Sequence, residues 1–218
     1  MSAGEDGSGC GLPGSGYPSD CEITQGLRER AMRRQEQEQR VASGRSDLLA
    51  RAREIRLLLL DVDGVLTDGS IIYAHSGTEL KAFSTRDGFG IRLLQEAGVE
   101  VGIITARSSE AVHRRAQDLG LRHVFQGVRN KIEAFDAILA EQQFVPAQIA
   151  YMGDDWLDLP LLIRAGLAAT VVDGAAEVRA VAHFVSSREG GRGAVRELCE
   201  LIVEARGLHR ELLARYMR

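Results

Sequence analysis

Cysteine is scarce in this sequence, and long apolar runs and any excess of basic residues are absent. The three cysteines, Cys10, Cys21 and Cys199, offer neither a disulfide framework nor a Cys-x-x-Cys metal site, which suits a reducing compartment. With 27 Lys and Arg against 31 Asp and Glu, the net charge of -4 argues against nucleic acid or an anionic membrane as the main partner. No apolar run reaches the roughly 18 residues of a membrane span, and no secretory signal opens the chain. We therefore expect a soluble cytoplasmic protein.

The first 54 residues differ in composition from the rest of the chain. Residues 1–20 are rich in glycine with almost no apolar side chains, so we expect disorder there. Residues 23–54 are rich in Arg, Gln and Glu, which is typical of a solvated helix, although a helix that contacts a partner would fit too. A translation start placed too far upstream is another explanation. We expect one catalytic domain over residues 55–205 and a tail over residues 206–218.

Short apolar segments alternate with helical patterns from residue 55 onward. The expected strands are IRLLLLD, VEVGIIT, HVFQG, QIAYMGDD, AATVVD and VAHFVSS. Helices of about 10 residues between such strands predict an α/β fold with a doubly wound parallel sheet of the Rossmann type. Residues 70–84 predict one β-hairpin, and Asp87 is expected to cap a helix that ends near Ala97.

Polar side chains follow three of the predicted strands. Asp61 and Asp63 follow the first strand, Thr105 follows the second, and Asp154 and Asp155 follow the fourth. Ligands bind at the carboxyl ends of the strands in such sheets, so these residues should converge on one crevice. A cluster of carboxylates without His or thiolate ligands needs a hard cation, and Mg²⁺ is the expected one.

Phosphoryl transfer is the chemistry that this arrangement favours. Lys131, near the start of a helix, and Thr105 could together hold a phosphoryl oxygen. One of Asp61 and Asp63 would attack phosphorus, and the other would protonate the leaving oxygen and then activate water. Taken singly, an Asp-x-Asp is often a solvated or capping pair, and an Asp-Asp after a strand is often a helix cap. In this sequence all of these signals occur together, in order and on the expected elements, which favours phosphoryl transfer.

Four motifs in this order, DVDGVLTDG, Thr105, Lys131 and GDDWLD, resemble those of the haloacid dehalogenase (HAD) superfamily across residues 55–205. The hairpin in place of a cap domain, together with FSTRDGFGIRLL, IITAR, FQGVRNK and GGRGAVRE, resembles the 3-deoxy-D-manno-octulosonate 8-phosphate phosphatase family. The resemblance implies a phosphatase of lipopolysaccharide sugar synthesis. It also implies a homotetramer in which hairpins and C-terminal segments help to close neighbouring active sites.

The resemblance assigns roles to the motif residues. Asp61 would be the nucleophile and Asp63 the general acid and base. Asp61, Asp154 and the Asp63 carbonyl would bind magnesium. Thr105 and Lys131 would hold the phosphate, Asp155 would support the metal or its waters, and Asp158 would orient the motif residues from behind.

Three arginines are candidates for recognising the sugar acid. Arg86 and Arg107 suit bidentate contact with a carboxylate, and Arg192, in a glycine-rich loop, would reach an anionic substrate. Surface salt bridges at Arg86 and Arg107, and a helix-capping turn around Arg192, are the alternatives. Ala106 departs from the glycine usual in the family, and residues 1–54 have no counterpart in its typical short members.

Other functions remain open at this point. By this resemblance, Arg107 favours the octulosonate 8-phosphate as the substrate. Nonulosonate 9-phosphates and other small sugar-acid phosphates are the alternative substrates. Transfer of the phosphoryl group to an acceptor other than water would use the same residues. A non-catalytic regulatory or assembly subunit is the rival from a different class of protein.

Overall fold

The computed structural model describes residues 20–218, which divide into two compact units between Arg45 and Ser46. The helix α1, Asp20–Glu54, runs through this division. The disorder predicted for residues 1–20 lies outside the described residues, apart from Asp20, where α1 begins. In the second unit the last turns of α1 belong to the core, where Ala52 is buried. None of the helices within residues 20–218 is long and apolar enough to cross a membrane.

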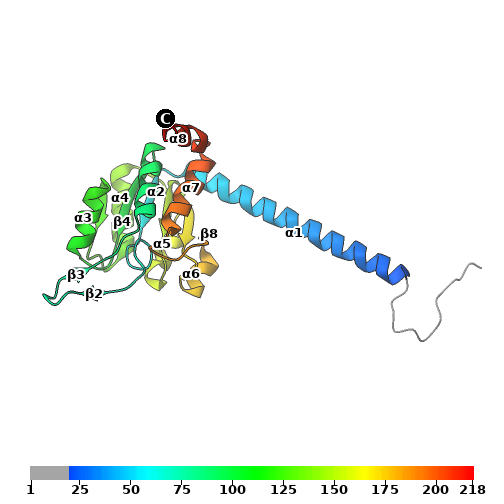
Figure 1. Cartoon of the computed structure of the whole chain (residues 1–218), viewed down its shortest axis with the longest axis horizontal. Helices are drawn as coiled ribbons and strands as arrows, with labels where there is room; N and C mark the ends of the chain where they lie inside the picture. Colours follow the sequence, from blue (N-terminus) through cyan, green and yellow to red (C-terminus); the bar gives the residue numbers. More distant parts are fainter. Residues whose placement is uncertain (1–19) are drawn as a thin grey trace, which may run out of the picture. The chain divides into compact units, whose positions relative to one another are not determined.

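A six-stranded parallel sheet forms the centre of the second unit (Figure 1). Its strand order is β5-β4-β1-β6-β7-β8, which confirms the predicted doubly wound α/β fold. The strands are β1 (Leu57–Leu60), β4 (Glu100–Ile104), β5 (His123–Phe125), β6 (Ile149–Met152), β7 (Leu167–Thr170) and β8 (Phe184–Val185). Leu57 is in register with Glu100 of β4 on one side and with Ile149 of β6 on the other. The winding direction reverses between β1 and β6, so the crevice for a ligand lies there.

Helices cover both faces of this sheet, and the side chains of β1 alternate between two cores. Leu58 and Leu60 join the larger cluster, whereas Leu57 and Leu59 join the smaller one, which explains the uninterrupted leucine run. The larger cluster is built with α2 (Thr85–Glu96), α3 (Glu110–Asp118), α7 (Ala194–Ala205) and α8 (His209–Arg215). The smaller cluster uses α4 (Lys131–Gln142), α5 (Leu159–Leu162) and α6 (Ala176–Val181). Short 3-10 turns, η1 (Pro146–Gln148) and η2 (Trp156–Asp158), flank β6.

The predicted hairpin is present as a separate two-stranded sheet between β1 and α2. Its strands, β2 (Ile72–Tyr73) and β3 (Glu79–Leu80), are antiparallel and turn through Gly77, whose φ is +80°. The hairpin extends away from the parallel sheet at lower left in Figure 1. About half of the surface of Ile72 and Leu80 is exposed.

Two local predictions were wrong. Ser84, not Asp87, caps α2, because the Ser84 hydroxyl accepts a hydrogen bond from the Asp87 amide. The buried Asp87 carboxylate instead accepts hydrogen bonds from the amides of Gly193 (3.1 Å) and Arg196 (2.8 Å) at the start of α7. The strand expected from VAHFVSS shrinks to β8, because its first residue belongs to α6.

Candidate active site

Three carboxylates meet at the reversal point of the sheet. Asp61 directly follows β1, and its amide donates to the Met152 carbonyl of β6 at 2.9 Å, which joins the two strand ends. Asp154 lies two residues beyond β6, and Asp158 ends η2. One oxygen from each of Asp61, Asp154 and Asp158 lies within 4.8 Å of the others. The convergence expected from the strand ends is therefore present for Asp61 and Asp154, and Asp158 joins them.

Lys131 supplies the positive charge of this cluster. As the first residue of α4, it follows Asn130, whose side chain caps the helix. Its ammonium lies 2.9 Å from Asp61 Oδ1 and 2.7 Å from Asp158 Oδ1, and its side chain is 5% exposed. Burial favours the neutral amine, but the charges of Asp61 and Asp158 outweigh this and raise the pKa of Lys131. Lys131 is thus a fixed cation beside Asp61.

Asp158 holds the loop after β6 in place. Its Oδ2 accepts hydrogen bonds from the amides of Asp154 (3.0 Å) and Asp155 (3.3 Å). Its Oδ1 accepts from Lys131 and from the Tyr151 hydroxyl, at 2.6 Å. Tyr151 is fully buried in β6 and was missed by the sequence analysis, because only a single polar atom in an apolar strand marks it. Asp158 therefore connects Lys131, β6 and the loop that carries Asp154.

The pKa values of Asp61 and Asp154 are raised well above the usual range. Burial, followed by the charge of Asp158, raises the pKa of Asp61 from 3.8 to about 6. Burial, followed by the charges of Asp61 and Asp158, raises the pKa of Asp154 from 3.8 to about 7. Lys131 lowers both values but does not compensate for three carboxylates. The cluster therefore carries an excess of negative charge.

The donor set fits a hard divalent cation such as Mg²⁺. Asp154 Oδ1 is buried and has no hydrogen-bond partner among the described residues. Gly64, with φ +90°, leaves room for the Asp154 carboxylate, because a Cβ at this position would overlap both of its oxygens. Oxygen ligands alone and excess negative charge are what Mg²⁺ requires. A cation here would satisfy the unpartnered oxygen.

Asp63 lies outside this cluster and contacts the hairpin instead. Its Oδ1 accepts a hydrogen bond from Lys81, just beyond β3. Arg107 Nε lies 3.8 Å from Asp63 Oδ2, and Arg107 Nη2 lies 2.5 Å from Glu79 Oε2. The hydrogen bond from Arg107 holds the pKa of Glu79 below its usual value. Lys81 and Glu79 were both missed, because a hairpin sequence gives no sign of which loop its side chains will meet.

The other sequence candidates occupy different places. Thr105 is 3% exposed, and its Oγ1 accepts from the Arg107 amide at 3.4 Å. The Asp155 carboxylate accepts from the Trp156 amide at 2.7 Å and caps η2. Arg86 is exposed in the first turn of α2. Arg192 is exposed and pairs with Glu189 at 3.3 Å.

The glycine-rich loop before α7 packs against the loop after β1. The Gly191 amide donates to the Val65 carbonyl at 2.9 Å. A Cβ at Gly190 would overlap the Gly64 carbonyl. The loop that carries Arg192 therefore borders the loop that carries Asp61 and Asp63.

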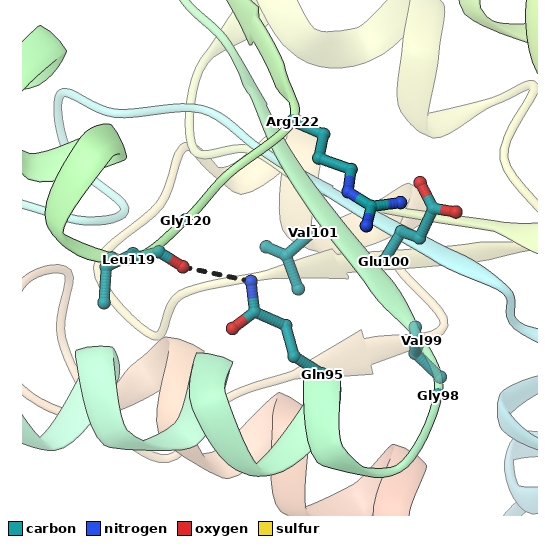
Figure 2. A pocket seen from close by; sticks show the side chains of 8 residues that line it. All are labelled: Gln95, Gly98, Val99, Glu100, Val101, Leu119, Gly120 and Arg122. Atoms are coloured by element: carbon teal, nitrogen blue, oxygen red, sulfur yellow. Dashed lines mark hydrogen bonds between the residues drawn. The ribbon is translucent and has the colours of Figure 1, made fainter.

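A surface pocket of about 380 Å³ lies apart from this site (Figure 2). It surrounds Glu100 at the start of β4, whereas Thr105 follows the end of that strand. Gln95 crosses the pocket and donates to the Leu119 carbonyl at 3.1 Å. None of the residues that line this pocket belongs to the carboxylate cluster.

The fold is that of the HAD superfamily. A HAD superfamily hydrolase of Legionella pneumophila has a TM-score of 0.79 and 37% identity, covering 82% of this chain and 98% of that one. The 3-deoxy-D-manno-octulosonate 8-phosphate phosphatase of Yersinia pestis is 46% identical over 159 residues, which are 73% of this chain and 85% of that protein. The chain belongs to the 3-deoxy-D-manno-octulosonate 8-phosphate phosphatase family.

A solved structure adds the ligands of one relative. The Moraxella catarrhalis 3-deoxy-D-manno-octulosonate 8-phosphate phosphatase, in complex with a magnesium ion, a phosphate ion and a KDO molecule, has a TM-score of 0.76. It is 40% identical, and the match covers 78% of this chain and 97% of that one. No family model matches the sequence.

Proposed function

We propose that this protein is a Mg²⁺-dependent phosphatase that hydrolyses 3-deoxy-D-manno-octulosonate 8-phosphate to the free sugar acid and inorganic phosphate. The observation that carries this proposal is the cluster of Asp61, Asp154 and Lys131 at the reversal point of the sheet, with one buried carboxylate oxygen unpartnered. The relatives at about 45% identity carry the name of this activity.

The reaction proceeds in two steps. Asp61 attacks phosphorus, the bond to the sugar oxygen breaks, and Asp63 gives its proton to that oxygen. Water then attacks the aspartyl-phosphate, Asp63 takes a proton from the water, and phosphate leaves with Asp61 restored. Lys131 and Thr105 hold the phosphoryl oxygens throughout; the buried Lys131 ammonium beside Asp61 supports this assignment.

The metal belongs between the two strand ends. Asp61, Asp154 and the Asp63 carbonyl would bind Mg²⁺, which supplies positive charge for the phosphoryl oxygens when bound. Asp155, which caps η2, would support the metal or its waters. Asp158 does not need to bind the metal, because its oxygens already hold Lys131, Tyr151 and two backbone amides. Its role is to orient Lys131 and Asp154.

Arginine side chains recognise the carboxylate of the sugar acid. Arg107, whose side chain is 42% exposed and 3.8 Å from Asp63, is the arginine best situated for this role. Arg86 and Arg192 complete the set. A nonulosonate 9-phosphate would use the same metal and the same nucleophile, so it is the substrate that a test must separate.

The active unit is a cytoplasmic homotetramer that serves lipopolysaccharide synthesis. Support for assembly comes from the hairpin, where Ile71, Ile72, Tyr73 and Leu80 are each about half exposed or more, which a neighbouring copy would cover. We assign catalysis to residues 55–205, with residues 1–54 as an extension and residues 206–218 as a tail.

The test is phosphate release from a panel of sugar-acid phosphates with Mg²⁺. Wild type and Asp61→Asn are compared with Asp136→Asn, which removes a carboxylate paired with Arg164 on the surface. Release from the octulosonate 8-phosphate that requires Asp61 and tolerates the Asp136 change would support the proposal. Preference for a nonulosonate 9-phosphate would change the substrate, and Mg²⁺ binding without any release would favour a regulatory subunit.

A further inference from the structure

The base of the hairpin buries a cation that has no role in the mechanism above. Lys81 has a side chain that is only 1% exposed. A buried ammonium is costly unless it is paired, and Lys81 contacts Asp63 Oδ1 and lies 3.1 Å from Glu79 Oε1. Lys81 and Lys131 are the only lysines of the sequence, and the other side chains counted among its 27 Lys and Arg are arginines. Both lysines lie beside an aspartate of the loop after β1.

Glu79 links Lys81 to a second cation. Its Oε1 faces Lys81, and its Oε2 lies 2.5 Å from Arg107 Nη2. Asp63, Lys81, Glu79 and Arg107 thus form a ring of alternating charge, closed by the 3.8 Å approach of Arg107 Nε to Asp63 Oδ2. The ring joins the hairpin to the loops after β1 and β4. Its formal charges cancel when Asp63 is ionised and leave one positive charge when Asp63 carries the proton that it gives to the leaving oxygen.

The two carboxylate oxygens of Asp63 have different surroundings in the ring. Oδ1 is held by the hydrogen bond from Lys81. Among the described residues, the ion-pair partner of Oδ2 is Arg107 Nε, at 3.8 Å, which is beyond hydrogen-bonding distance. A carboxylate that must give and take a proton needs one oxygen available and a fixed orientation. The arrangement supplies both properties.

We propose that Lys81 is a positioning residue, which fixes the Asp63 carboxylate through Oδ1 and leaves Oδ2 for proton transfer, with Glu79 as the anion that keeps Lys81 and Arg107 in place. This inference rests on the proposed function, in which Asp63 protonates the leaving oxygen. A role limited to anchoring the hairpin is the alternative. Because Arg107 is proposed to bind the sugar-acid carboxylate, the test uses two substrates without a carboxylate, which this alternative would affect equally.

Two substrates separate these roles. The leaving group of an alkyl phosphate without a carboxylate, such as glycerol 3-phosphate, is a strongly basic alkoxide that needs a proton from Asp63, whereas that of p-nitrophenyl phosphate is a weakly basic phenolate that needs none. The constant kcat/KM covers only the steps up to departure of the leaving group. The ratio of kcat/KM values for the two substrates therefore reports on protonation and is insensitive to a uniform loss of active enzyme.

The variants are Lys81→Met, which fills the space without charge, and Lys81→Arg, which keeps the charge. Arg164→Met removes a surface cation paired with Asp136 and serves as the matched control. We expect Lys81→Met to lower kcat/KM for glycerol 3-phosphate by about a hundredfold, a typical contribution of general acid catalysis, and to change that for p-nitrophenyl phosphate by less than about threefold. Lys81→Arg should recover most of the loss, and the control should behave as wild type.

Equal losses on both substrates, or no loss on either, would overturn the proposal. Glu79→Gln provides a second variant if Lys81→Met does not fold, because Glu79 lies nearer to solvent, and it should lower the ratio in the same direction. An unchanged ratio in folded Glu79→Gln would then count against the ring. If the wild type released no phosphate from the octulosonate 8-phosphate, the proposed function would fail and this inference with it; release from that substrate with an unchanged ratio in Lys81→Met overturns the inference alone.

Discussion

Binding of Mg²⁺ should release protons, and its affinity should fall steeply below neutral pH. The cause is the carboxylate cluster, where burial raises the pKa of Asp154 to about 7 and that of Asp61 to about 6. A metal ligand must be ionised, so protons compete with Mg²⁺ for these oxygens. The pKa of each group is higher in the folded protein than its value of 3.8 in a free chain, so both groups bind protons more tightly when the protein is folded. Without metal, the stability that they contribute is therefore complete below about pH 4 and is lost as the pH rises through 6 to 7.

The size of the effect follows from the ionised fractions. With a pKa of about 7, Asp154 is about one tenth ionised at pH 6 and about nine tenths ionised at pH 8, so the apparent affinity for Mg²⁺ should drop about tenfold. Asp61 adds a further factor of about two over the same interval. Mg²⁺ should also raise the melting temperature more at pH 8 than at pH 6, because it compensates the repulsion among the carboxylates.

Isothermal titration calorimetry with Mg²⁺ at pH 6 and pH 8 would measure this. Titrations near pH 7 in two buffers of different ionisation enthalpy give the number of protons released. Asp136→Asn removes an exposed carboxylate that pairs with Arg164 outside the cluster and should match the wild type, whereas Asp61→Asn should bind Mg²⁺ weakly and lower the pKa of Asp154 by removing a like charge. Equal affinity at both pH values without proton release would refute the reasoning.

Three substitutions test other parts of the structure. Gly64→Ala places a Cβ against the Asp154 carboxylate at a φ of +90°, and we expect activity to fall about a hundredfold in phosphate-release assays. Asp87→Ala leaves two amides of α7 without their acceptor and should lower the free energy of unfolding in urea by about 1 to 3 kcal/mol. Tyr151→Phe removes one of the hydrogen bonds to Asp158 and should cost about 1 kcal/mol in the same experiment, with Mg²⁺ affinity retained.

The sequence was sufficient for the parallel sheet because its signals are local. Leu57–Leu60 is an uninterrupted apolar run followed by Asp61, and the structure buries all four leucines on the two faces of the sheet. Ligands bind at the carboxyl ends of the strands in such sheets, so the meeting of the strand ends that carry Asp61 and Asp154 could be predicted as well.

Contacts between segments far apart in the chain could not be predicted from these local signals. Asp87 in the first turn of α2 looks like a cap for its own helix, yet it binds the amides of α7, more than 100 residues later. The sequence also gives no sign of the contacts of Tyr151 and Lys81, because these depend on Asp158 and Asp63 lying opposite them in the fold. Periodicity reports which face of an element is buried, but it does not report the partner of a single polar atom.

Two aspartates separated by one residue have opposite electrostatic surroundings in this structure. Asp61 lies with Asp154 and Asp158 around a single lysine, so its environment has an excess of negative charge and calls for a cation. Asp63 lies in a ring with two cations and Glu79, so it needs no metal to balance its charge. The proposed nucleophile, Asp61, and the proposed acid, Asp63, can therefore share one loop, although only Asp61 lies in a cluster that calls for a cation. The hairpin, through Lys81 and Glu79, is the element that makes these surroundings different.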